Sequence, residues 1–238
     1  MSHLLEEGVS IIIPTYNRKK FEKLIEYNIL IQTYPYIKEI IIGDDGDDEP
    51  ICLRIPYPIH YHRLPRLSIG QKRNYLISKA TGKYIINMDT DDFYSKEYIS
   101  TSIFTLIDND KECCGSADML IFNGTDYYKQ SCMFLYLLNE ATICMTRAMW
   151  ETTNGYAIQN SSEGADLIKS NIKKVCETKE MLMCCVGHKS NTIDKSIWYK
   201  DIYKSETNNE YINHIKIIST LNIYDAILPT SITSKRDA

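Results

Sequence analysis

The 238-residue chain lacks several features that mark common classes of protein. No apolar run is long enough to span a membrane. The first residues carry Glu6 and Glu7, where a signal peptide needs a basic flank and a longer apolar stretch. The eight cysteines include no CxxC pair, which argues against zinc and redox motifs of that type. We therefore expect a soluble, cytoplasmic protein without a transmembrane segment and with free thiols.

Basic residues are not in excess, because the formal net charge is -4. A dedicated nucleic-acid binder carries surplus Lys and Arg to neutralise phosphates, so we expect no nucleic-acid partner. No GxGxxG motif follows the first predicted strand, which argues against a Rossmann dehydrogenase. Apolar residues make up 44% of the chain and charged residues 24%, an ordinary globular composition.

Apolar β-branched runs alternate with amphipathic stretches in the first part of the chain. The predicted strands are 9–13, 37–43 and 84–88, and the predicted helices between them are 19–33 and 70–81. Gly82 is a plausible cap for the second helix, and Ser95 for a third that runs to about Ile107. This order predicts an α/β fold with a mostly parallel sheet flanked by helices.

The second part of the chain is less regular. Short strands are expected near 119–122, 141–145 and 181–186, and a helix near 165–175. We expect both parts to form a single compact domain.

Polar residues follow each of the three early strands, and those after the second and third are acidic. They are residues 14–18, 44–46 and 89–92. Ligands of open α/β sheets bind outside the carboxyl ends of the strands. Two acidic clusters at one edge repel each other unless a cation or a hydrogen-bond donor lies there. A hard divalent cation prefers carboxylate oxygens and joins them to substrate phosphates. The pattern therefore predicts a metal site for a phosphate-containing substrate.

The same residues carry a resemblance to a known family. Residues 9–18, VSIIIPTYNR, resemble the opening motif of the inverting GT-A glycosyltransferases known as glycosyltransferase family 2. The segments similar to the family's later motifs are 40–46, 70–74, 80–85 and 87–92, the last ending in a DxD motif. The resemblance implies a GT-A fold. It also implies metal-dependent, inverting transfer of a hexose from a UDP-sugar donor to a hydroxyl acceptor.

The resemblance also implies a role for each matching residue. Those expected to bind the nucleotide or the donor sugar are Pro14, Thr15, Tyr16, Arg18, Asp45, Arg73, Asp89, Thr90 and Asp91. Asp91 and Asp92 would hold a divalent metal, manganese or magnesium. His188 follows a late apolar strand and would complete the metal site, as a C-terminal histidine does in many enzymes of this fold.

The catalytic base is the point at which the chain departs from the family pattern. The family usually has an acidic pair whose second member is the base, and that position is Gly164 here. Inversion needs a carboxylate to take the proton of the acceptor hydroxyl. Glu163 is the first candidate for that carboxylate and Asp166 is the second.

Residues 1–94 are expected to form the nucleotide-sugar-binding half, 95–230 the acceptor-binding and catalytic half, and 231–238 a tail. A glycan, a protein and a lipid-linked molecule are equally open as acceptors. Two alternatives remain. One is a catalytically inactive nucleotide-sugar-binding module, which Gly164 motivates. The other is a sugar-1-phosphate nucleotidyltransferase, which the absence of a Gly-rich loop after the first strand disfavours.

Overall fold

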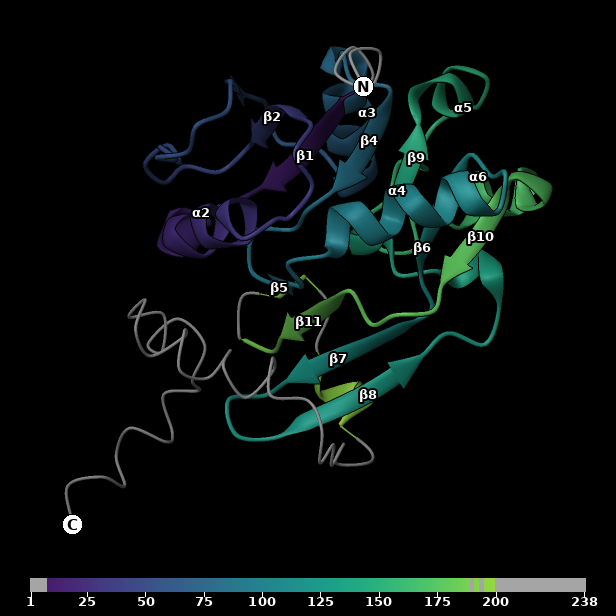
Figure 1. Cartoon of the computed structure of the whole chain (residues 1–238). Helices are drawn as coiled ribbons and strands as arrows, with labels where there is room; N and C mark the ends of the chain where they lie inside the picture. Colours follow the sequence, from purple (N-terminus) through teal and green to yellow (C-terminus); the bar gives the residue numbers. More distant parts are fainter. Residues whose placement is uncertain (1–7, 189–190, 193–194, 200–238) are drawn as a thin grey trace.

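The described part of the chain forms two sheets, with helices on both faces of the larger one (Figure 1). The computed structural model describes residues 8–188, 191–192 and 195–199. The predicted tail, 231–238, and residues 200–230 of the predicted acceptor half lie outside this range.

The larger sheet has seven strands. In spatial order they are β10 (Val175–Thr178), β6 (Cys113–Ser116), β9 (Cys144–Thr146), β4 (Tyr84–Asn87), β1 (Val9–Thr15), β2 (Ile37–Asp44) and β3 (Ile59–Arg63). Only β9 runs antiparallel to its neighbours in this sheet. The sheet is therefore mostly parallel, which confirms the predicted α/β class.

Among the residues that the structure describes, five helices cover the two faces of this sheet. They are α2 (Glu22–Leu30), α3 (Ile69–Lys79), α4 (Tyr98–Asp108), α5 (Arg147–Glu151) and α6 (Ala165–Ser170). Ile11 of β1 belongs to one apolar cluster, with α2 and α4, and Ile12 to the other, with α3, α5 and α6. Successive side chains of a strand point to opposite faces, so the apolar run of β1 supports helices on both sides. No helix in the described residues is long and apolar enough to cross a bilayer.

A second sheet of four strands lies beyond the carboxyl ends of β1 and β4 (Figure 1). Its strands, in spatial order, are β5 (Phe93–Tyr94), β11 (Met183–Val186), β7 (Asp118–Phe122) and β8 (Tyr127–Ser131). The short 3-10 segments of the chain are η1 (Lys19–Phe21), η2 (Leu135–Leu137), η3 (Glu140–Thr142), η4 (Ile172–Lys174) and η5 (Lys195–Trp198). The second sheet places residues from the later part of the chain opposite the acidic strand ends.

Both predicted helix caps are wrong, because tertiary contacts take their place. The main-chain N–H of Ser95 donates to Leu182 O at 3.0 Å, so this segment continues from β5 and α4 begins only at Tyr98. Helix α3 ends at Lys79 with an extended residue after it. Gly82 instead lies against the first strand, where an added Cβ would be 2.5 Å from Gly8 O.

The predicted helix near 165–175 is shorter than expected. Helix α6 ends at Ser170, a 3-10 turn follows, and Val175 pairs with Cys113 in a parallel ladder. The helical segment therefore ends early because the following residues pair with β6, a strand that the sequence did not predict.

The loop before α6 is held tightly against the start of α3. Gly70 N–H donates to Gln159 O at 3.1 Å, and Ile69 N–H donates to the Asn160 side chain at 2.9 Å. Asn74 Nδ2 donates to Tyr156 O, and the Tyr156 main-chain N–H donates to Asn74 Oδ1, both at 2.8 Å. A Cβ on Gly70 would lie 1.8 Å from Ala157 O, so only glycine permits this approach.

We predict that Gly70→Ala lowers the free energy of unfolding by about 1–3 kcal/mol, since the added methyl group must displace the loop backbone. Chemical denaturation measures this loss. Ser78→Ala is the matched control, because Ser78 lies on the exposed face of the same helix. Equal stability of Gly70→Ala and the control would contradict the close approach.

Candidate active site

A cavity of about 740 Å³ opens at the carboxyl edge of the larger sheet, facing the second sheet. The predicted residues in its wall are Pro14, Thr15, Tyr16, Arg18, Arg73, Asp89, Thr90, Asp91, Asp92 and Glu163. Asp45 is bonded to Lys72 of this wall, and His188 is hydrogen-bonded to Asp91 of the wall. Asp166 is exposed in the first turn of α6 and is not part of the wall. The structure therefore brings together nearly all of the predicted site.

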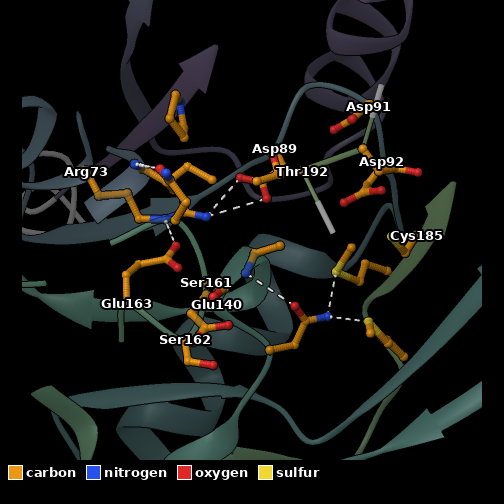
Figure 2. A pocket seen from close by; sticks show the side chains of 18 of the residues that line it. Arg73, Asp89, Asp91, Asp92, Glu140, Ser161, Ser162, Glu163, Cys185 and Thr192 are labelled. Carbon is orange, nitrogen blue, oxygen red and sulfur yellow. Dashed lines mark hydrogen bonds and ion pairs between the residues drawn. The ribbon is translucent and has the colours of Figure 1, made fainter. Parts of the chain in front are cut away.

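The Arg73 side chain, 2% exposed, joins two carboxylates across this cavity (Figure 2). Its Nη2 lies 3.1 Å from Asp89 Oδ1 and its Nε lies 3.0 Å from Glu163 Oε1. Burial acts to lower the pKa of Arg73, but Asp89 and Glu163 outweigh it and hold the pKa above its ordinary value. Burial raises the pKa of Asp89, and Arg73 opposes that rise. The guanidinium thus links the end of β4 to the loop before α6.

Asp91 and His188 meet at the other side of the cavity, although 97 positions separate them. His188 Nε2 lies 2.7 Å from Asp91 Oδ2, and Arg18 Nε lies 3.4 Å from the same oxygen. Burial acts to raise the pKa of Asp91, but the hydrogen bond with His188 and the charge of Arg18 outweigh it and lower the pKa. Asp91 is therefore held as a carboxylate.

Asp92 points to a different partner. Its Oδ1 accepts the Val186 main-chain N–H at 3.0 Å, and burial followed by the charge of Asp91 raises its pKa to about 7. Within the described ranges, no three His, Cys, Asp or Glu side chains are arranged to hold a metal ion. The Asp91 carboxylate and the His188 imidazole nevertheless suit a divalent ion, to which each would contribute one ligand.

The end of β2 supplies a second polar cluster. Asp45 is fully buried and accepts from Lys72 Nζ at 2.6 Å and from Leu67 N–H at 2.9 Å. Burial lowers the pKa of Lys72, and its hydrogen bond and ion pair with Asp45 oppose that effect. The Arg66 guanidinium lies 3.5 Å from the centre of the Tyr16 ring at the cavity wall. This corner combines a flat aromatic surface with fixed charges.

Two polar atoms in the wall have no hydrogen-bond partner among the described residues. Thr15 Oγ1 and Arg73 Nη1 are both buried. An unsatisfied buried polar group costs about 1–3 kcal/mol, so such atoms persist where a ligand or water completes them. Their position indicates a polar ligand with acceptor oxygens.

Sequence reasoning missed Lys72 and Glu140 in this wall. Lys72 stands beside Arg73 in a segment that carries the family resemblance, so that segment contained a usable signal. Glu140 precedes β9, and residues before a strand of a parallel sheet lie at the edge away from the site. Because β9 runs antiparallel to β4, its start lies at the site edge instead. Nothing in the local pattern reveals that direction.

The model of the glycosyl transferase family 2 domain matches residues 10–164, more than half of the chain. The chain belongs to glycosyltransferase family 2. This membership confirms the resemblance carried by the motifs and the glycosyltransferase class that it implies.

Curated proteins that are similar to this chain match it over only part of their own length. An uncharacterized glycosyltransferase of Rickettsia conorii is 29% identical over 131 residues, which cover 53% of this chain and 20% of the relative. Glycosyltransferase GlyG of Streptococcus pneumoniae is 28% identical over 59% of this chain and 47% of its own length. The O-antigen biosynthesis glycosyltransferase WbnJ of Escherichia coli is 28% identical over 55% and 54%. The chain thus spans between a fifth and about half of these relatives.

Solved structures share the fold. TarS 1-349 of S. aureus in complex with UDP-GlcNAc has a TM-score of 0.59 at 14% identity, covering 94% of this chain and 68% of that one. The mannosyltransferase PcManGT of Pyrobaculum calidifontis, in complex with GDP-Man and Mn2+, has a TM-score of 0.59 at 12% identity, covering 97% and 76%. These likenesses agree with the predicted GT-A fold.

We predict that Arg73→Ala lowers the free energy of unfolding at pH 8 by about 3–5 kcal/mol, because it leaves the buried Glu163 and the partly buried Asp89 without their cation. The loss should shrink at low pH, where Asp89, whose pKa is raised by burial, takes up a proton and loses the charge that needed a partner. Urea unfolding at both pH values measures the difference. A loss below 1 kcal/mol at pH 8 would show that the bridge contributes little.

Proposed function

We propose that the chain transfers a sugar from a UDP-sugar to an acceptor hydroxyl, with inversion at the anomeric carbon and with a divalent metal. The observation that carries the proposal is the cavity wall itself. It combines an Asp91–His188 pair suited to a metal with the unpartnered Arg73 Nη1 and Thr15 Oγ1, which suit the oxygens of a nucleotide diphosphate. Family membership and the polar corner around Asp45 support a nucleotide-sugar donor.

Each group has a task in this scheme. Asp91 and His188 would hold Mn2+ or Mg2+, which supplies charge neutralisation for the leaving diphosphate. The predicted third ligand, Asp92, would add a second carboxylate beside them, and one of its oxygens accepts the Val186 N–H. Arg73 and Asp89 would position the donor at the centre of the cavity. Because both side chains are already fixed by an ion pair, little reorganisation is needed when the donor binds.

A carboxylate on the acceptor side must take the proton of the attacking hydroxyl. Glu163, the first candidate from the sequence, lies in the cavity wall, whereas Asp166 is exposed outside it. The UDP-GlcNAc complex of TarS and the GDP-Man and Mn2+ complex of PcManGT support a nucleotide-sugar donor for this chain as well. A glycan, a protein and a lipid-linked molecule all remain candidates for the acceptor.

We predict that UDP raises the melting temperature in the presence of Mn2+ and much less in its absence. Binding to the folded state alone stabilises it by an amount that grows with the logarithm of ligand concentration over Kd. A panel of UDP-glucose, UDP-galactose, UDP-GlcNAc and GDP-mannose, each with and without Mn2+, identifies the donor as the largest shift. Absence of any nucleotide-dependent shift would refute the proposed function.

We further predict that Asp91→Asn and His188→Ala each weaken Mn2+-dependent UDP binding about tenfold or more, since each removes one ligand from the ion. Isothermal titration with UDP at fixed Mn2+ measures the loss. Asp47→Asn is the control, because Asp47 is an exposed acid in the loop after β2. If the Asp91 and His188 variants bound UDP and Mn2+ as tightly as the control, the metal assignment would be wrong.

A further inference from the structure

Glu140 contributes a second acceptor-side carboxylate to the cavity (Figure 2). It opens the 3-10 turn before β9, and its main-chain oxygen accepts from Asn87 Nδ2 at 2.6 Å. Asn87 is the last residue of β4, so this bond fixes the backbone of Glu140 at the site edge of the sheet. Neither the proposed function nor the sequence motifs use this side chain.

Gly164 makes the space that Glu140 occupies. A Cβ added to Gly164 would lie 3.2 Å from Glu140 Cγ, 3.1 Å from Ile143 Cδ1 and 3.4 Å from Tyr156 Cε1. A longer side chain at position 164 would therefore point at the place where the Glu140 side chain lies. The carboxylate side chain next to Gly164 is therefore supplied by position 140, whereas the family pattern would supply it from position 164.

The two acceptor-side carboxylates differ in their charged partners. Glu163 Oε1 forms an ion pair with Arg73. Protonating Glu163 would therefore remove one of the two anions that neutralise this buried cation, the other being Asp89. Glu140 forms no salt bridge within the part of the chain that the structure describes. The ionisable groups that face it are Glu163, Arg73 and Cys132. Burial and then the charge of Glu163 raise the pKa of Glu140 to about 7, the range of an effective general base.

We infer that Glu140 is the general base of the transfer reaction and that Glu163 is a positioning residue that holds Arg73 in place. The inference rests on the proposed function. In the reaction, a Glu140 oxygen takes the proton from the acceptor hydroxyl as that oxygen forms a bond to the anomeric carbon. The bond from the anomeric carbon to the diphosphate breaks, and its electron pair leaves with the nucleotide. Glu140 then returns the proton to solvent.

The first test compares three variants of the full chain: Glu140→Gln, Glu163→Gln and the control Glu151→Gln, which changes an exposed side chain of α5. Stabilisation by UDP with Mn2+ reports on the donor site. Turnover is followed as nucleotide release from the four sugar nucleotides of the donor panel, with water as the acceptor. Glu140→Gln should retain donor binding and lose about 100-fold or more in kcat, the usual contribution of a general base.

The outcomes distinguish failure of the proposed function from failure of the assignment of Glu140 as the base. If the wild type binds no nucleotide and releases none, the proposed function and the assignment of Glu140 both fail. If the wild type turns over and Glu140→Gln keeps its kcat, the assignment of Glu140 alone is overturned. Loss of turnover in Glu163→Gln, with donor binding and folding intact and Glu140→Gln unaffected, identifies Glu163 as the base instead.

A second measurement needs no activity. The pKa of Glu140 rises from 4.5 to about 7 on folding, so between these pH values the folded chain holds a proton that the unfolded chain has released. The free energy of unfolding therefore falls as pH rises through this window, and Glu140→Gln removes that fall. Relative to the wild type, Glu140→Gln should gain stability from pH 4.5 to pH 7. A constant difference across the window would show that Glu140 is ionised like an exposed acid and would overturn the assignment.

Discussion

A buried guanidinium is the constraint on which the rest of the site depends. Arg73 is 2% exposed, and a charge in such a place needs well-placed counter-charges to persist. Asp89 arrives from the end of β4 and Glu163 from the loop before α6, so the ion pairs tie the early and late parts of the domain together. The close contact at Gly70 brings that loop within reach of α3. Packing and electrostatics therefore specify the same arrangement.

The early part of the fold follows from local sequence. The runs around Ile11, Ile41 and Ile85 are apolar on both faces, which is typical of strands covered by helices on two sides. Each run stops at polar or acidic residues, and parallel pairing places those stops at one edge. That reasoning is enough to predict the cavity and most of its wall. The Asp91–His188 contact spans 97 positions, so only the family resemblance predicted it.

The parts that local sequence does not predict depend on pairing direction and on distant contacts. Strand β9 runs antiparallel, so its start lies at the site edge and brings Glu140 into the cavity wall, which the local sequence pattern does not predict. Ser95 and Gly82 have the side chains of helix caps, but contacts with Leu182 and with Gly8 determine their conformations. Asp166, the second candidate for the base, is exposed in the first turn of α6 and lies outside the cavity wall.

The most direct test of the account is a crystal structure of the chain with UDP and Mn2+, with the ion located by its anomalous scattering. We predict a single strong peak beside Asp91 Oδ2 and His188 Nε2, with the diphosphate between this peak and Arg73. A diphosphate bound elsewhere, or an ion held by the exposed acids after β2 with none at Asp91, would contradict it.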